Sequence, residues 1–384
     1  MNKTERLFDK NSKLSAFDAH VLSCEELDGE KYAVVLDSTA FFPNEGGQAC
    51  DTGVIGGAEV ISVDEKDGII VHTVNKVIKA GEKVRGEIDF EIRFRKMQNH
   101  TAEHIISGII NRLFGYSNVG FHLGDGYMTA DFDGELSEED IARVESLANR
   151  AVFECRPIRA YYPTTDELKT LEYRSKLDFY ENVRIVDIEG VDKCACCAPH
   201  VENTGEVGLV KIVDAIRYKG GMRLTMLAGY DALADYRARQ EQAKRISMAI
   251  SAKQSEVAEG VDRLLDEMSA LKGKISSLKR EILSYKLEKL QKTDENIVIF
   301  EEDGDMLALR NFVNEAVKKT DKICACFSGN DESGYKYIIA SERIPLRAMS
   351  KEISAALGGK GGGSDAMIQG SCTATRERIE EFFR

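Results

Sequence analysis

The chain has 384 residues, a net charge of −13, and 43% hydrophobic and 30% charged residues. The length suits two or three domains with cores of their own. The absence of any run of about 18 apolar residues excludes a membrane-spanning helix. We see no basic start followed by an apolar run and expect no signal peptide. The acidic balance disfavours a nucleic-acid partner unless basic residues cluster locally.

The cysteines are odd in number and scattered along the chain. A secreted disulfide framework normally has an even number of Cys at regular spacing. The pattern therefore predicts a protein of the reducing cytoplasm, in which some thiols bind metal. The nine are Cys24, Cys50, Cys155, Cys194, Cys196, Cys197, Cys324, Cys326 and Cys372.

Residues 1–90 have the pattern of strands and turns, and we predict a small β-barrel or an open sheet. Short runs rich in β-branched residues, bounded by Gly or Asp, mark the strands at 32–36, 60–63, 68–74 and 83–88. Between the first two lies a loop, 37–53, with Pro43 and several Gly. Its Gly-Gly-Gln at 46–48 has two equal interpretations, a hairpin turn or a loop that covers a ligand.

The first convincing helix spans 91–116 and contains the sequence HTAEH. His100 and His104 are four residues apart, so both imidazoles lie on one face of the helix, one turn apart. Cys196 and His200 repeat that spacing in a Cys-rich segment that has the pattern of a loop. Two pairs of nitrogen or sulfur ligands are what a tetrahedral zinc site needs. A carboxylate-free set of this kind argues against magnesium or calcium.

Further elements follow in order. We predict a strand at 127–133, a helix at 137–150 capped by Ser137, and a strand, a helix and a strand over 157–190. Segments 209–213 and 222–227 complete this part as strands.

Residues 231–293 have a different pattern. Apolar residues recur in alternating steps of four and three, which predicts a coiled-coil seam. We expect it to join two copies of the chain, and Gly260 is a candidate hairpin point. The alternative is a long helix packed on its own chain. The seam comprises Val257, Val261, Leu264, Met268, Leu271, Ile275, Leu278, Ile282 and Tyr285.

The end of this helical segment carries a local basic stripe. Its members are candidates for contact with a phosphate backbone, although a solvated face is the simpler interpretation. They include Lys272, Lys279, Arg280 and Lys286.

Residues 294–384 have the pattern of a small α/β unit. We predict strands at 297–300, 322–327 and 335–340 and helices at 306–318 and 345–357. The Gly-rich run 358–363 is predicted as a loop whose backbone N–H groups and Lys360 bind an anion, with Gly361 and Gly362 at its centre. Its spacing does not fit a Walker loop.

Several of these motifs together resemble a known family. TAFFPNEGGQ, HTAEH and a Cys-x-x-x-His stretch followed by TGEVG, in this order, resemble the editing domain of alanyl-tRNA synthetase and of free-standing AlaX-type editing proteins. The tail with GGKGGGSDAMIQG resembles the C-terminal domain of alanyl-tRNA synthetases. Since fewer than a hundred residues precede His100, no aminoacylation domain fits before it. The resemblance is therefore to the long free-standing form.

The resemblance implies an α+β fold in four parts. These are a β-barrel-like subdomain (1–90), a zinc-binding editing domain (91–230), a helical coiled-coil segment (231–293) and a C-terminal α/β domain (294–384). It also implies zinc ligands at His100, His104, Cys196 and His200. The family's Cys-Gly-Gly-Thr-His reads Cys-Cys-Ala-Pro-His here, so Cys194 and Cys197 remain alternative thiolates.

The implied activity is hydrolysis of serine from wrongly charged alanine tRNA, with one zinc ion as cofactor, and removal of glycine is left open. The implied partner is the acceptor end of tRNA(Ala), bound by a cytoplasmic homodimer without a membrane partner. Glu103 is the candidate general base, and Thr39, Gln48 and Thr101 are candidate polar contributors. Rival hypotheses are an editing protein for another mischarged tRNA, such as Ser-tRNA(Thr), and a non-catalytic zinc-stabilised RNA-binding protein.

Overall fold

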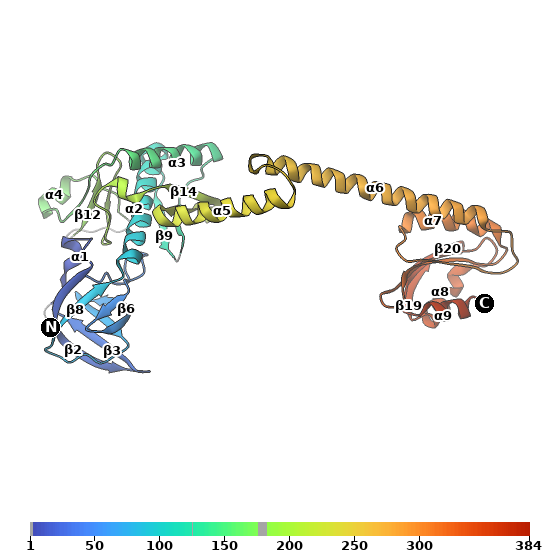
Figure 1. The fold of residues 1–384 in the computed structure, drawn as a ribbon, viewed down its shortest axis with the longest axis horizontal. Coiled ribbons are helices and arrows are strands. Elements are labelled where there is room, and N and C mark those ends of the chain that lie inside the picture. The colour runs from blue at the N-terminus through green and yellow to red at the C-terminus, as the bar shows by residue number, and fades with distance from the viewer. Residues whose placement is uncertain (1–2, 125, 176–182) are drawn as a thin grey trace. The chain divides into compact units, whose positions relative to one another are not determined.

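The computed structural model describes residues 3–124, 126–175 and 183–384, and it confirms an α+β fold (Figure 1). The chain divides into two compact units, 1–242 and 243–384. The division of the chain into four parts stays a prediction. Within the described residues, no helix is both long enough and apolar enough to cross a membrane.

The first unit begins with six strands in the order β2-β3-β7-β6-β5-β8, and β8 pairs back with β2 to close the sheet into a barrel. Alternate side chains of β2, Phe17, Ala19 and Val21, point into its core. This alternation was visible in the sequence, yet the longest strand was not predicted. The strands are β2 (Ala16–Leu27), β3 (Lys31–Leu36), β5 (Gly53–Ile55), β6 (Ala58–Lys66), β7 (Ile69–Val74) and β8 (Lys83–Ile88). Short β1 (Glu5–Arg6) pairs with β4 (Ser38–Thr39), and α1 is Leu7–Lys10.

Helix α2 (Phe90–Phe114) is the central element of this unit. It begins at Asp89, whose carboxylate accepts a hydrogen bond from the Ile92 amide, and it ends at Gly115 in the left-handed conformation. Its middle is buried on every side, from Met97 to Ile110. A helix buried all round holds its polar side chains in fixed positions, which suits a site.

A second core surrounds α2. A four-stranded sheet in the order β14-β15-β10-β9 and helix α3 (Glu138–Phe153) pack on it. Ser137 and Asp140 form a capping box at the start of α3, as the sequence predicted for Ser137. The sheet strands are β9 (Asn118–Leu123), β10 (Met128–Phe132), β14 (Val210–Tyr218) and β15 (Gly221–Ala228).

A third sheet, in the order β11-β12-β13, carries the Cys-rich segment. That segment is not all loop: its first half is strand β13 (Asp192–Ala195), paired antiparallel with β12 (Ile185–Ile188). The ladder continues from β12 to β11 (Ile158–Tyr161), and α4 is Thr165–Thr170. Strand pairing therefore fixes the residues that precede Cys196.

Helix α5 (Gly229–Ala249) leads into the second unit, and α6 (Val257–Lys289) follows after a break at 250–256. The predicted hairpin point at Gly260 is wrong. This residue lies inside α6, where a Cβ would come within 2.6 Å of Ile250 Cδ1 and 3.0 Å of Ala252 Cβ. The absence of a side chain at Gly260 lets the break pack against α6.

The C-terminal sheet has the order β16-β17-β18-β20-β19. On one side, α7 and the last turns of α6 pack through Leu283 and Phe312. On the other, α8 and α9 pack through Ile353 and Ile379. The elements are β16 (Ile297–Glu301), α7 (Met306–Ala316), β17 (Cys324–Asn330), β18 (Gly334–Ala340), α8 (Leu346–Ala356), β19 (Gly359–Gly363), β20 (Met367–Cys372) and α9 (Arg376–Phe382).

The Gly-rich run is a strand and not the predicted loop. Gly359–Gly363 forms β19, the edge strand, and pairs with β20 along its whole length. At one position a side chain does not fit: a Cβ on Gly361 would lie 1.9 Å from the Tyr337 hydroxyl. Glycine here lets the strand lie close to the rest of the sheet. Composition alone cannot distinguish this role from that of a loop that binds an anion.

Candidate metal centre

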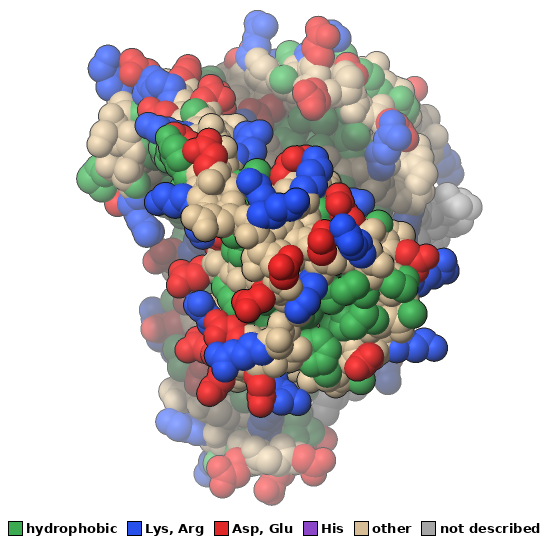
Figure 2. Space-filling model, turned by 90° about the vertical axis from the view of Figure 1, so that its right-hand side faces the viewer, with side chains coloured by type: hydrophobic (Ala, Val, Ile, Leu, Met, Phe, Trp, Pro, Cys, Tyr) green, Lys and Arg blue, Asp and Glu red, His purple; other side chains and the backbone are tan. Residues whose placement is uncertain are grey.

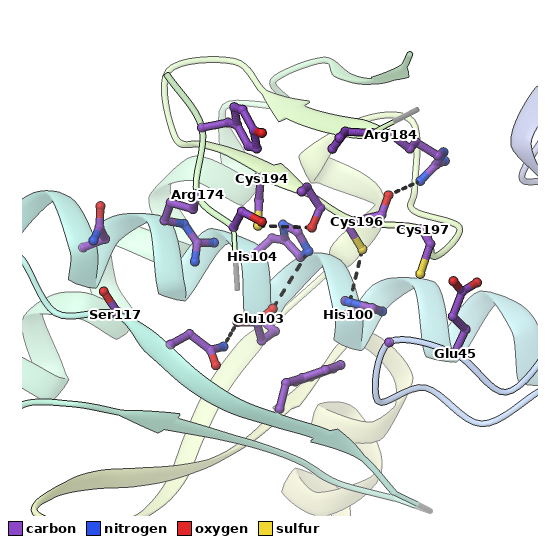
Figure 3. A pocket seen from close by; sticks show the side chains of 18 of the residues that line it. Glu45, His100, Glu103, His104, Ser117, Arg174, Arg184, Cys194, Cys196 and Cys197 are labelled. Carbon is purple, nitrogen blue, oxygen red and sulfur yellow. Dashed lines mark hydrogen bonds and ion pairs between the residues drawn. The ribbon is translucent and has the colours of Figure 1, made fainter. Parts of the chain in front are cut away.

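Four side chains from two distant segments converge on one point in the first unit. His100 and His104 come from the buried middle of α2, and Cys196 and His200 from the segment after β13. Their ligand atoms lie within 4.8 Å of one another. The structure thus brings together the four residues that the sequence singled out, and Figure 3 shows His100, His104 and Cys196 among them.

Each of the three histidines is held by a hydrogen-bond partner at Nδ1. His100 Nδ1 lies 2.9 Å from Gln48 Oε1, His104 Nδ1 lies 3.1 Å from Asp192 Oδ2, and His200 Nδ1 lies 2.9 Å from Thr101 Oγ1. A proton on each Nδ1 makes the three hydrogen bonds and leaves each Nε2 with a free lone pair. This is how ligand histidines are held around a metal ion.

The distances between donor atoms fit a tetrahedral ion. Cys196 Sγ lies 3.6 Å from His100 Nε2 and 3.3 Å from His200 Nε2. A tetrahedron with the usual zinc–sulfur and zinc–nitrogen bond lengths has a sulfur–nitrogen edge of about 3.5 Å. Three imidazole nitrogens and one cysteine sulfur are also a donor set that zinc prefers. The residues present therefore fit a zinc ion.

The electrostatics distinguish Cys196 from the two neighbouring thiols. Burial opposes ionisation of Cys196, but His100 and His200 hold its pKa well below the usual value. Burial raises the pKa of Cys194 to about 11, and burial together with nearby Cys196 and Glu45 raises that of Cys197. Burial also lowers the pKa of His200 to about 3. Among the three, Cys196 is the thiol poised to be a thiolate ligand.

The cluster opens into a pocket of about 760 Å³, a volume typical of small-molecule sites. His100, His104 and Cys196 form part of its wall, and Asn118 and Phe121 of β9 form another part. Arg6, Tyr162, Tyr173, Arg174 and Arg184 also line it.

Glu103, the candidate general base, lies in the pocket but is not free. The Ser107 hydroxyl and the Asn118 amide both donate to its Oε1. Its other oxygen, Oε2, lies 4.0 Å from His104 Nε2. One carboxylate oxygen is thus anchored, and the other faces the metal centre.

The other polar candidates lie outside the pocket wall. Gln48 and Thr101 orient His100 and His200, as described above. Thr39 is fully buried in the barrel, where its hydroxyl lies 2.9 Å from His72 Nε2. None of the three lines the cavity among the described residues. These three residues are therefore better placed to support the site and the fold than to contact a substrate directly.

The Gly-Gly-Gln turn has the hairpin geometry of the first interpretation of its sequence, and its role over a ligand stays a prediction. Glu45 and Gln48 pair as in a hairpin, and Gly46 and Gly47 have positive φ. The turn also approaches β9 closely: a Cβ on Gly47 would lie 2.7 Å from the Phe121 carbonyl oxygen. A turn that only glycine permits thus brings Gln48 to His100.

Sequence reasoning missed the side chains that hold the centre in place. Arg174 donates from Nε and Nη2 to Asp192, the partner of His104. Arg184 donates to the Cys196 and Ala198 carbonyls and so shapes the segment between the two ligands. No motif marks these residues, because their role depends on the segments of Arg174 and Arg184 lying beside β13 and the residues that follow it.

The candidate tRNA-binding residues lie in the second unit. Lys279 pairs with Asp303 at 2.6 Å, and Lys286 pairs with Glu301 at 2.5 Å. Lys272, Arg280 and Lys360 are exposed. These two ion pairs neutralise part of the positive charge of the predicted basic stripe.

Three family models match parts of the chain. Residues 5–92 match the class II (A) tRNA synthetases, residues 183–264 the second additional domain of threonyl- and alanyl-tRNA synthetases, and residues 294–384 the DHHA1 domain. The second of these matches includes Cys196 and His200. The matches reach both units, but nearly all of helix α2, with His100 and His104, lies between the first two matched ranges.

Curated relatives span the whole chain. The alanyl-tRNA editing protein AlaX-L of Pyrococcus horikoshii is 29% identical over 98% of this chain and 96% of its own length. The alanine–tRNA ligase of Pyrococcus abyssi is 31% identical over 100% of this chain, and that of Methanococcus vannielii is 29% identical over 99%. This chain spans less than half the length of the ligases, 44% and 43%. Together with the family models, the match over 96% of the length of AlaX-L shows that the chain is similar to AlaX-type alanyl-tRNA editing proteins along nearly its whole length.

Proposed function

We propose that the protein is a zinc-dependent hydrolase that removes serine from mischarged alanine tRNA. The main support is the convergence of three oriented imidazoles and the Cys196 thiol at the wall of a pocket. The similarity to AlaX-L and to alanine–tRNA ligases supports alanine tRNA as the carrier. The reaction is hydrolysis of the ester between the amino acid and the terminal ribose.

Zinc, when bound, supplies a Lewis acid that polarises an ester carbonyl. The protein's part is to hold the ion and orient the ester. Asp192, Gln48 and Thr101 fix the three imidazoles, and β9 and the Cys194–Cys197 segment shape the cavity. A dry, rigid wall of this kind keeps the ester in one pose.

Selection of serine over alanine follows from the chemistry of editing. The two amino acids differ by one hydroxyl, which an apolar pocket rejects poorly. A site that hydrogen-bonds the hydroxyl discriminates against the analogue lacking it by roughly 10⁴-fold. Removal of serine is therefore a task that a second, polar pocket performs better than the first selection step.

Deacylation of seryl- and alanyl-charged tRNA(Ala) by the zinc-loaded protein tests the proposal, with His104→Ala as a variant. We expect the seryl ester to be cleaved, the alanyl ester to be spared, and the folded variant to be inactive. A glycyl ester in the same assay decides whether glycine is also removed. If neither ester is cleaved by zinc-loaded protein, the proposal is wrong for this tRNA.

Two other functions are outcomes of the same experiment. The match to a domain shared by threonyl- and alanyl-tRNA synthetases makes Ser-tRNA(Thr) the second substrate to assay. A non-catalytic zinc-stabilised RNA-binding protein would cleave none of these esters. In that protein His100→Ala would unfold the first unit, which circular dichroism would reveal.

We propose that the second unit contributes tRNA binding. Exposed Lys272, Arg280 and Lys360 offer charge, and Gly361 and Gly362 leave the edge of the sheet uncovered by side chains. Figure 2 shows Lys and Arg interspersed with Asp and Glu over the face in view, without a field of one sign. Binding should therefore depend on a few phosphate contacts and weaken with salt.

We also propose that α6 joins two copies of the chain. Its predicted seam is exposed, for example 36% at Val261, 60% at Leu271 and 56% at Tyr285. Helix α5 has no matching stripe, since residues 237–245 are polar apart from Ala238 and Ala243. A second copy offers an identical stripe of the same length, which is the geometry of a two-stranded coiled coil.

A further inference from the structure

The two oxygens of the Glu103 carboxylate have different surroundings. The side chain is 5% exposed. Ser107 and Asn118 hold Oε1, and Asn118 Nδ2 also lies 3.2 Å from the Ser107 hydroxyl, so the three side chains form a closed group. Oε2 takes no part in this group and lies 4.0 Å from His104 Nε2 (Figure 3).

The hydrogen bonds that hold this carboxylate come from neutral donors, and His104 Nε2 is the basic group nearest to Oε2 among the contacts described above. Among the described residues, neither Lys nor Arg forms an ion pair with Glu103. Arg174 lines the same pocket but is bound to Asp192 through Nε and Nη2. Burying a carboxylate whose hydrogen bonds come from neutral donors is costly, and a cation hydrogen-bonded to Oε2 would lower that cost.

The proposed substrate carries a cation at the right place. In an aminoacyl ester the α-ammonium nitrogen lies two bonds from the ester carbon, about 2.5 Å away. A zinc ion bound to His104 would lie about 2.0 Å from the imidazole Nε2. When the ester carbonyl faces the ion, the ammonium group therefore lies within reach of Glu103 Oε2, which is 4.0 Å from His104 Nε2.

We propose that Glu103 Oε2 binds the α-ammonium group of the aminoacyl ester, so that the enzyme selects esters with a free amino group over α-hydroxy and N-acylated esters. This inference rests on the proposed function. It assigns Glu103 a role in substrate recognition and not that of general base. The group of Ser107 and Asn118 then positions the carboxylate.

The test compares three esters on tRNA(Ala). They are the seryl ester, the α-hydroxy ester made from it by nitrous acid deamination, and the N-acetylseryl ester. The deaminated ester keeps the size of the substrate and loses only the charge. Each rate is divided by the uncatalysed rate, because an α-ammonium group itself activates an ester.

The full-length, zinc-loaded protein should prefer the seryl ester by about ten- to a hundred-fold, the range for a hydrogen bond to a charged group. Glu103→Gln keeps the size of the side chain and an oxygen for Ser107 and Asn118, so fold and zinc content should persist. In this variant the preference should fall to within about three-fold, through loss of rate on the seryl ester alone. Ser107→Ala should give an intermediate preference because it loosens Oε1.

Three results would overturn the inference, and they are distinguishable. Equal cleavage of seryl and α-hydroxy esters by the unaltered protein refutes ammonium recognition and leaves the proposed function intact. Equal slowing of all esters by Glu103→Gln indicates a general base. If no ester is cleaved, the proposed function fails, and the inference fails with it.

Discussion

Asp192 lies between two side chains from different segments, Arg174 and His104. Its Oδ2 lies 3.1 Å from His104 Nδ1 and 2.7 Å from Arg174 Nη2, and the residue is buried. A charged partner in this position fixes the imidazole and increases its basicity as a ligand. Arg174 in turn keeps the carboxylate ionised by holding the pKa of Asp192 low against burial.

Asp192→Asn should therefore weaken zinc binding by about ten- to a hundred-fold, because the amide leaves Arg174 unpaired and holds His104 weakly. Competition with a chelator measures the zinc Kd. Asp187→Asn is the matched control, since Asp187 on β12 pairs with Lys193 and touches no candidate ligand. An unchanged Kd for Asp192→Asn would mean that the carboxylate does not orient His104.

At the scale of elements, the room available for side chains around the edge strand β19 accounts for one of its glycines. Gly361 faces the Tyr337 ring, where a Cβ would lie 1.9 Å from the hydroxyl, whereas a Cβ on Gly362 meets nothing within 4 Å. Tyr337 is fully buried in the core beneath. The two neighbours thus differ in environment while sharing one strand.

Gly361→Ala should destabilise the second unit by about 1–3 kcal/mol, because a methyl group overpacks against Tyr337. Gly362→Ala should be neutral within about 0.5 kcal/mol. Urea unfolding followed by circular dichroism measures both. If the two variants have the same free energy of unfolding, close approach is not the reason for glycine at 361.

The barrel contains a buried titratable group away from the metal centre. His72 on β7 lies 3.2 Å from the Val34 carbonyl through Nδ1 and 2.9 Å from the Thr39 hydroxyl through Nε2. Burial lowers the pKa of His72 from 6.5 to about 4. The folded barrel therefore holds His72 in its neutral form.

This depressed pKa predicts how barrel stability depends on pH. The unfolded chain binds a proton at His72 below pH 6.5, the folded chain only below about pH 4. The stabilising contribution is therefore complete above pH 6.5 and is lost as the pH falls through this window, by about 3 kcal/mol in total. In His72→Gln the slope of unfolding free energy against pH should be smaller between pH 6.5 and 4. Parallel curves for the two proteins would contradict the prediction.

At the scale of the whole molecule, α6 has unlike halves. Residues 258–272 carry four acidic and two basic side chains, and residues 274–289 carry five basic and two acidic ones. Two of the basic residues, Lys279 and Lys286, form ion pairs within the unit. With these two left out, the first half of α6 is still net acidic and the second half still net basic. In an antiparallel pair the acidic half faces the basic half, whereas a parallel pair places like charges together.

We therefore expect an antiparallel pair centred at residue 273, in which Val261 faces Tyr285 and Leu271 faces Ile275 of the partner copy. Oxidation of mixed Val261→Cys and Tyr285→Cys proteins should give a disulfide between positions 261 and 285, identified by mass spectrometry of the linked peptides. Gly273→Cys, on the opposite face of the helix, is the control and should not link. A 261–261 disulfide would show a parallel pair, and a monomer in sedimentation would refute pairing.

The sequence determined the local features of this protein. The spacing of His100 and His104 on a helix, that of Cys196 and His200, and the heptad seam of α6 follow from backbone periodicity, which depends only on residues near in the chain. Ser137 at the start of α3 and the β-branched strands of the barrel follow for the same reason.

Only the tertiary structure decided what those residues meet. Asp192, Arg174 and Gln48 reach the histidines because strands and turns distant in the chain lie beside α2. The Gly-rich run became a strand because β20 pairs with it and Tyr337 lies beneath it. Hydrogen-bond partners and close approaches depend on long-range packing, and no spacing along one chain encodes them.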